Sequence, residues 1–80
     1  YDLKLQIAGL SEGYDDVVIR GNPAERSFSC LYFVGGRLIA TDAINSPRDF
    51  VQSKQLIADR AAIDMEKVAD ADIPLKDLLI

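Results

Sequence analysis

The residue types that carry most enzyme chemistry are almost absent from this chain. Among 80 residues there is no histidine and one cysteine, Cys30. Without histidine the chain cannot assemble a Ser/His/Asp or Cys/His relay, or a metal site with histidine ligands. One cysteine and scattered carboxylates do not make a metal site either. We therefore expect no catalytic and no metal-binding residue in this segment.

The glycine spacing gives no phosphate-binding turn. Gly9 with Gly13, and Gly35 with Gly36, fit neither a Gly-x-Gly-x-x-Gly turn nor a P-loop. The chain has 13 acidic and 9 basic residues, and its net charge is −4. Nucleic-acid binding depends on clustered Lys and Arg, so we expect no nucleic-acid partner. We also expect no cofactor to be bound by this segment alone.

Three basic side chains are the candidates for contact with a partner protein. Arg48 and Lys54 fall in a predicted helix, and Lys76 falls in a predicted terminal turn. The surrounding sequence is acidic, because residues 59–77 carry six acids against three bases. For each lysine a solvated surface side chain is the alternative interpretation. Lys54 would then lay its aliphatic stem on the sheet and its ammonium at the edge.

The N-terminal half of the chain has the pattern of β-strands. Residues 3–7 alternate apolar and polar side chains, which predicts a strand with one buried face. That face consists of Leu3, Leu5 and Ile7. Residues 16–20 contain a β-branched run and precede Gly21-Asn22-Pro23, which predicts a second strand that runs into a turn.

The strongest local signal is a β-hairpin. Residues 27–34 and 37–44 flank Gly35-Gly36, a pair that suits the positive φ angles of a type I′ turn. A two-residue loop predicts these pairs: Val34 with Arg37, Phe33 with Leu38, Tyr32 with Ile39, Leu31 with Ala40, Cys30 with Thr41, and Phe28 with Ala43. Both faces of the ribbon are apolar, so we expect a helix on one face and another domain on the other.

A helix is predicted from Pro47 to about Ala61. Ser46 is placed as its N-cap, and Asp49 is placed to help neutralise the free amides of the first turn. The apolar stripe expected to lie on the sheet consists of Phe50, Ile57, Ala58 and Ala61. Leu56 is expected on the opposite side of the helix, where its position indicates that a second surface approaches.

Residues 62–80 predict two short helical turns. Asp64 is placed to cap a brief helix through Val68, and Ile73-Pro74 introduces a last turn. The residues expected to share a face of that turn are Leu75, Leu78 and Leu79. The order of about four to five strands followed by helices predicts an α+β domain with an antiparallel sheet.

We expect residues 1–80 to form a single domain cut from a longer cytoplasmic protein. The chain opens at Tyr1, without an initiator methionine and inside a strand pattern. Cys30 lies in an apolar run and is expected to be a small, reduced core residue of an intracellular protein. No apolar stretch approaches the roughly 20 residues of a membrane span, so we expect no membrane contact.

Three stretches form a pattern over nearly the whole chain: YDLKLQIAGL (residues 1–10), AINSPRDFVQSK (43–54) and IPLKDL (73–78). In this order they resemble the C-terminal domain of the FAD-dependent ferredoxin reductases. This family includes putidaredoxin reductase, rhodocoxin reductase and the reductases of aromatic dioxygenase systems. In the family an aromatic segment with a Trp beside the flavin precedes the match to Tyr1, and this chain contains no Trp.

The resemblance implies a parent flavoprotein in which an FAD domain and an NAD(P)H domain precede this module. Electrons would pass from nicotinamide through flavin to a two-iron ferredoxin. The module would pack against the FAD domain and help form the ferredoxin-facing surface. Because the family's ferredoxins are acidic, Lys76 is the first docking candidate, with Arg48 and Lys54 as further basic candidates.

A second hypothesis remains open. The chain would be a free-standing interaction or dimerisation module without a redox role, and its apolar surface would be closed by self-association. The two hypotheses differ in what precedes Tyr1. Two glycine-rich dinucleotide-binding fingerprints upstream would support the reductase, and their absence would favour the free-standing module.

Overall fold

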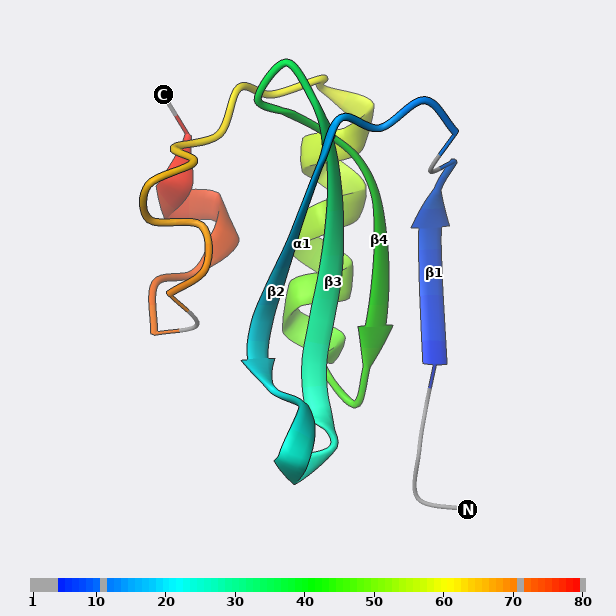
Figure 1. Cartoon of the computed structure of the whole chain (residues 1–80), viewed down its shortest axis with the longest axis vertical. Coiled ribbons are helices and arrows are strands. Elements are labelled where there is room, and N and C mark those ends of the chain that lie inside the picture. The colour runs from blue at the N-terminus through cyan, green and yellow to red at the C-terminus, as the bar shows by residue number, and fades with distance from the viewer. Residues whose placement is uncertain (1–4, 11, 71, 80) are drawn as a thin grey trace.

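The computed structural model describes residues 5–10, 12–70 and 72–79. Its strands are β1 (Leu5–Gly9), β2 (Asp16–Asn22), β3 (Ser27–Val34) and β4 (Arg37–Ile44). The helix α1 (Pro47–Ala58) follows, with the short 3-10 turns η1 (Pro23–Glu25) and η2 (Leu75–Leu78). The sheet has the order β1-β4-β3-β2 with all neighbours antiparallel (Figure 1). This is the predicted α+β architecture, with four strands.

One face of the sheet is covered and the other is open. Helix α1 packs on β4 and β1, and the C-terminal segment, residues 59–70 and 72–79, lies beside β2 (Figure 1). An isolated β-bridge between Arg37 and Ala62 joins this segment to β4. A second bridge, between Ile63 and Leu79, joins the two ends of the segment to each other. The helix and the C-terminal segment together form a second layer on the same side of the sheet.

The predicted Gly35-Gly36 hairpin is confirmed. Both glycines have positive φ angles, 57° and 78°, as a type I′ turn requires. The pairs nearest the turn, Val34 with Arg37 and Phe33 with Leu38, are also as predicted. The turn therefore sets the local register of the hairpin.

Beyond Phe33 the predicted register is wrong by one residue. A β-bulge leaves Ile39 without a partner, and the observed pairs are Tyr32 with Ala40, Leu31 with Thr41, Cys30 with Asp42, and Phe28 with Ile44. The extra residue reverses the faces of the rest of β4. Thr41 and Ala43 are thereby buried under α1, whereas Asp42 points to the open face. The bulge avoids placing the Asp42 carboxylate beneath the helix, where its desolvation would be costly.

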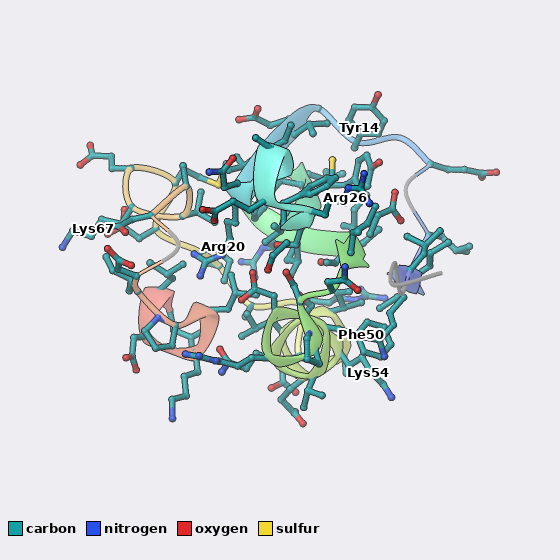
Figure 2. The ribbon with its side chains drawn as sticks, turned by 90° about the horizontal axis from the view of Figure 1, so that it is seen from below. Tyr14, Arg20, Arg26, Phe50, Lys54 and Lys67 are labelled. Atoms are coloured by element: carbon teal, nitrogen blue, oxygen red, sulfur yellow. The ribbon has the colours of Figure 1, made fainter. Side chains whose placement is uncertain are left out.

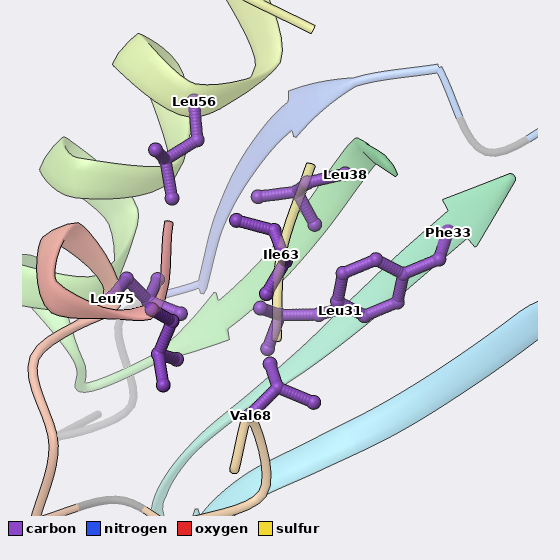
Figure 3. Packing of buried hydrophobic residues seen from close by; sticks show 8 residues of the cluster. Leu31, Phe33, Leu38, Leu56, Ile63, Val68 and Leu75 are labelled. Carbon is purple, nitrogen blue, oxygen red and sulfur yellow. The ribbon is translucent and has the colours of Figure 1, made fainter. Parts of the chain in front are cut away.

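The core lies between the covered face and the second layer (Figure 3). Its buried members are Leu31 and Phe33 on β3, Leu38 on β4, Leu56 on α1, and Ile63, Val68, Leu75 and Leu78 of the C-terminal segment. Half of these residues come from the C-terminal segment, so that segment is an integral part of the core. Leu79, which was expected to share the face of Leu75 and Leu78, is 53% exposed.

Helix α1 begins at Pro47 with Ser46 at the N-cap position, as predicted, but its capping, its end and its buried face differ from the prediction. It ends at Ala58, before the predicted Ala61, and the Ser46 hydroxyl donates to the Ile44 carbonyl instead of capping the helix. The fully buried helix residues are Ser53 and Leu56, while Phe50 and Ile57 of the predicted stripe are half-buried and Ala58 is exposed. The C-terminal segment causes this difference, because it is the second surface to which Leu56 was predicted to turn.

Strand β1 and the turn after Asp64 also depart from the predictions. Leu5 and Ile7 are 58% and 62% exposed, so the face predicted to be buried is open to solvent; Leu3 lies outside the described residues. Residues 65–69 form turns where a short helix was predicted. The Asp64 carboxylate accepts from the Glu66 amide, and the Val68 carbonyl accepts from Arg20, which takes this acceptor away from a helix.

Candidate functional site

A buried arginine joins the C-terminal segment to the sheet. The side chain of Arg20, on the covered face of β2, is 1% exposed. Its guanidinium donates to the carbonyls of Val68, Asp70 and Ile73 at 2.8, 3.1 and 2.6 Å. It also donates to Asp49 Oδ2 at 3.3 Å, in an ion pair with α1.

The same carboxylate links the helix to β3. Ser29 Oγ donates to Asp49 Oδ2 at 2.8 Å. Asp49 was predicted to neutralise the helix N-terminus, but its side chain instead connects α1 with two strands. Because Arg20 holds the carbonyls just before η2, this network fixes where η2 and its exposed residues lie.

Two of the three basic candidates lie on the same side of α1. Lys76 is exposed, and its backbone amide donates to Gln52 Oε1 of α1 at 3.1 Å. Arg48 is exposed at the start of the helix, where it lines a cavity of about 390 Å³ together with Pro74, the residue before η2. The structure therefore places Arg48 and Lys76 around the contact between α1 and η2.

Lys54 lies on the opposite flank of the helix. It is exposed, and its Nζ lies 5.5 Å from the ring centre of Phe50, a cation–π arrangement. Together with Ala8 of β1 it lines a shallow cavity between the strand and the helix. Figure 2 shows Phe50 and Lys54 side by side on α1. The structure thus separates Lys54 from the other two candidates.

The face of the sheet away from α1 carries a continuous set of apolar side chains, which we name the open face. Its members alternate with the covered positions on all four strands. They are Leu5, Ile7, Val17, Ile19, Phe28, Cys30, Tyr32, Val34 and Ile44. Ile19 is 52% exposed and Val34 is 40% exposed. Figure 2 shows Tyr14 on this side of the sheet and α1 on the other.

A polar pair lies in the middle of the open face. The Tyr32 hydroxyl donates to Asp42 Oδ2 at 2.9 Å, and the Tyr14 ring packs against the Tyr32 ring with 5.2 Å between centroids. The pKa of Tyr32 is raised above its ordinary value. The largest cause is the interaction with the Cys30 side chain, followed by the hydrogen bond with Asp42 and by burial. The hydroxyl therefore stays protonated and remains a donor at neutral pH. Cys30 was predicted to be a buried core residue, but it is half-buried on this face.

The cavity at the start of α1 does not fit the diphosphate of a flavin nucleotide. In the cavity at the start of α1 the Arg20 guanidinium is already bonded to three carbonyls and a carboxylate, and Asp49 adds negative charge that would repel a diphosphate. Among the described hydroxyls, Thr41 Oγ1 and Ser53 Oγ are buried without a hydrogen-bond partner. Thr41 is on β4 and Ser53 is on α1, and these two elements pack against each other. In the described ranges no group of three or more His, Cys, Asp or Glu residues is placed to hold a metal ion.

Sequence reasoning missed the two polar features that organise the domain. Arg20 had a signal, because it shares a strand face with Val18 and interrupts an otherwise apolar run. The pairing of Tyr32 with Asp42 had none, since it depends on a bulge that local patterns do not indicate.

The fold defines a small α+β module with an open apolar face on one side and exposed basic side chains on the other. Residues 1–79 match the family described as Reductase C-terminal. The chain belongs to this family.

No described helix is long and apolar enough to cross a membrane.

Curated relatives are ferredoxin reductases by name. The chain is 46% identical over 78 residues to the 5,5'-dehydrodivanillate O-demethylase ferredoxin reductase subunit of Sphingobium sp. (strain SYK-6). It is 42% identical over 79 residues to putidaredoxin reductase of Pseudomonas putida. These matches cover 98% and 99% of the chain but 19% of each relative. The chain thus spans about one fifth of the length of the curated relatives that it matches.

Solved structures agree with this relationship. The fold matches a chain of the covalent putidaredoxin reductase–putidaredoxin complex with a TM-score of 0.89 and 42% identity, covering 98% of this chain and 19% of that one. It matches a ferredoxin reductase from Rhodopseudomonas palustris with a TM-score of 0.82 and 41% identity, covering 99% of this chain and 20% of that one. The predicted family resemblance is confirmed.

Proposed function

We propose that this chain is the C-terminal structural and ferredoxin-docking domain of an FAD-dependent NAD(P)H:ferredoxin reductase. The observation that carries the proposal is the match of nearly the whole chain to the reductase in the covalent putidaredoxin reductase–putidaredoxin complex. Two further relatives that are named as ferredoxin reductases also support it. Residues 1–80 are then one domain of a larger flavoprotein, which we place in the cytoplasm.

In this proposal the redox chemistry belongs to the rest of the parent. FAD and NAD(P)H bind to the nucleotide-binding domains, and electrons pass from nicotinamide through flavin to a two-iron ferredoxin. This segment binds no cofactor and supplies no catalytic residue. It contributes a fixed surface, which the Arg20 network positions by tying the C-terminal segment to both the sheet and α1.

We assign ferredoxin docking to the side of the domain where α1 meets η2. Lys76 and Arg48 are exposed there, while the C-terminal segment around them is acidic. An acidic partner is repelled by most of this segment, so the exposed cations determine the position at which it binds. Complementary charge at such points mainly sets the rate and orientation of encounter. Lys54 stands on the other flank of α1 and is the weaker docking candidate.

The proposal is tested with the parent protein. The purified parent should carry FAD and reduce a two-iron ferredoxin with NADH or NADPH, whereas the isolated 80-residue chain should be colourless and should reduce no acceptor. The reason is that the chain has no glycine-rich phosphate-binding turn, and that Asp49 would repel a diphosphate in the cavity at the start of α1. A flavin absorption band in the isolated chain, or a flavin-bearing parent that passes electrons to no two-iron ferredoxin, would contradict the proposal.

The open face favours one alternative function, a free-standing interaction or dimerisation module without a redox role. That module would close its apolar surface by pairing with a second copy. Sequence upstream of Tyr1 in the same reading frame separates the two functions. Dinucleotide-binding fingerprints support the reductase, and a start codon directly before this domain supports the module.

A further inference from the structure

We infer that Gln52 is a further docking residue, whose side-chain Nε2–H group donates a hydrogen bond to a carboxylate of the ferredoxin. The inference rests on the proposed function, because it requires a ferredoxin that binds where α1 meets η2. It deepens that function by adding an uncharged donor to the exposed cations, and by explaining how this donor is aimed.

The position of Gln52 on α1 is the first observation. Arg48 precedes it by four residues and Leu56 follows it by four, so the three side chains lie along one row of the helix. Arg48 is exposed, Gln52 is half-buried and Leu56 is 4% exposed in the core. Gln52 therefore lies at the border between the packed contact of α1 with η2 and the solvent.

The contact with Lys76 fixes the orientation of the Gln52 amide. The backbone N–H of Lys76 donates to Gln52 Oε1 at 3.1 Å. Because a backbone N–H group can only donate, the oxygen of the amide must face it, and Nε2 must point away from it. Among the residues that the structure describes, Gln52 Nε2 has no hydrogen-bond partner. It therefore keeps two donors for another molecule.

A purely structural role accounts for only half of this amide. The turn η2 begins at Leu75, and no side chain caps its N-terminus at Pro74. The Lys76 amide is therefore one of the free N–H groups of a helix start, and Gln52 Oε1 satisfies it. A carboxylate at position 52 would satisfy it equally well. What distinguishes glutamine is its NH2 group, which the structural role leaves unused.

The charge of the surroundings indicates what this group binds. Lys76 is exposed, and its ammonium attracts a carboxylate of an acidic partner. A carboxylate has about four lone-pair sites, and a single ammonium uses only part of them. A neutral donor on a residue in contact with Lys76 adds a hydrogen bond to a charged acceptor, and such bonds are stronger than those between neutral groups. Gln52 thus complements Lys76 without adding charge.

The inference is tested in the full-length parent with its two-iron ferredoxin. Gln52→Met keeps the length of the side chain but removes both the acceptor and the donor. Gln52→Glu keeps an acceptor for the Lys76 amide and replaces the donor by a negative charge. The control is Gln55→Met, because Gln55 is an exposed glutamine of the same helix whose Nε2 already donates to Asp59 Oδ2 at 2.9 Å.

Three quantities are measured for each variant. They are the apparent KM for ferredoxin at about 0.02 M and about 0.3 M ionic strength, the rate of flavin reduction by the nicotinamide, and hydrogen exchange of the η2 segment by mass spectrometry. The unchanged parent and Lys76→Glu are measured beside them, because Lys76→Glu shows how a charge effect declines with salt.

Gln52→Met should raise the apparent KM for ferredoxin by roughly threefold to tenfold at both ionic strengths, since a hydrogen bond at contact distance is screened little by salt. Gln52→Glu should raise the KM most at low ionic strength, where the added charge repels the partner. It should leave hydrogen exchange of η2 unchanged, because its carboxylate still accepts from the Lys76 amide. Flavin reduction should stay the same in every variant, and Gln55→Met should change none of the three quantities.

Three outcomes would overturn the inference. If the effect of Gln52→Met disappears at high ionic strength, as that of Lys76→Glu should, Gln52 only positions Lys76. If Gln52→Met slows flavin reduction, the residue supports the packing of the parent. If the unchanged parent reduces ferredoxin and Gln52→Met leaves the KM as it was, the inference fails and the proposed function stands. A parent that reduces no ferredoxin would instead remove the proposed function, and this inference with it.

Discussion

Arg20 allows the irregular C-terminal segment to pack as part of the core. Its guanidinium satisfies the backbone carbonyls of Val68, Asp70 and Ile73, which belong to no regular helix or strand. Buried carbonyls without partners are costly, so an irregular segment can be packed only if another group supplies the donors. Arg20 does this with one planar, multidentate side chain, whose Nε–H also donates to Asp49.

Replacing Arg20 by Met should therefore be strongly destabilising. The change keeps an aliphatic stem but leaves three carbonyls and the Asp49 carboxylate without their partner, and we expect a loss of about 3 kcal/mol in the free energy of unfolding. Urea unfolding of the chain measures it. The matched control is Arg48→Met, an exposed arginine that should change stability by less than about 0.5 kcal/mol. Equal effects at the two positions would show that the Arg20 network does not hold the segment.

At the scale of elements, the hairpin turn is the feature that the sequence predicts most clearly. Gly35 and Gly36 both adopt φ angles that other residues rarely take. Gly35→Val and Gly36→Val should each lower the free energy of unfolding by about 1 kcal/mol or more. The space around Gly35 is open, and a Cβ at Gly36 would meet only Met65 Cγ at 4.0 Å, so the cost comes from the backbone and not from a clash. Urea melts that match the unchanged chain for both variants would contradict the turn assignment.

The elements show where local prediction fails. Strand and turn positions follow from alternation and from Gly-Gly, because these signals are contained in a few neighbouring residues. The bulge at Ile39 is not local, since it relieves a conflict between Asp42 and a helix that comes later in the chain. The buried face of α1 is likewise set by the C-terminal segment, which packs around Leu56. A helical wheel that takes the sheet as the only neighbour predicts burial of Phe50 and Ile57 instead of Leu56.

At the scale of the whole molecule, the open face lies on one side of the sheet, and Arg48 and Lys76 are exposed on the other side, where α1 meets η2. Sequence patterning predicted that both faces of the hairpin need cover, and it predicted the exposed basic candidates Arg48, Lys54 and Lys76. It could not predict on which side of α1 Lys76 lies, because that depends on where the C-terminal segment packs. The Arg20 network, which decides that position, is made of contacts between residues up to 53 positions apart.

The most direct test of the docking role is charge reversal at Lys76 in the full-length reductase, with Lys67→Glu as the control. Lys67 is an exposed lysine in the same acidic segment, on the turns beside β2 (Figure 2). Stopped-flow kinetics should be recorded for flavin reduction by the nicotinamide and for electron transfer to ferredoxin, over a range of ionic strength.

The account predicts that Lys76→Glu raises the apparent KM for ferredoxin by roughly threefold to tenfold at low salt and flattens its dependence on ionic strength. Flavin reduction should stay unchanged, and Lys67→Glu should alter neither step. If Lys76→Glu instead slows flavin reduction and leaves the ferredoxin kinetics as they were, Lys76 supports the packing of the parent, and ferredoxin docks elsewhere.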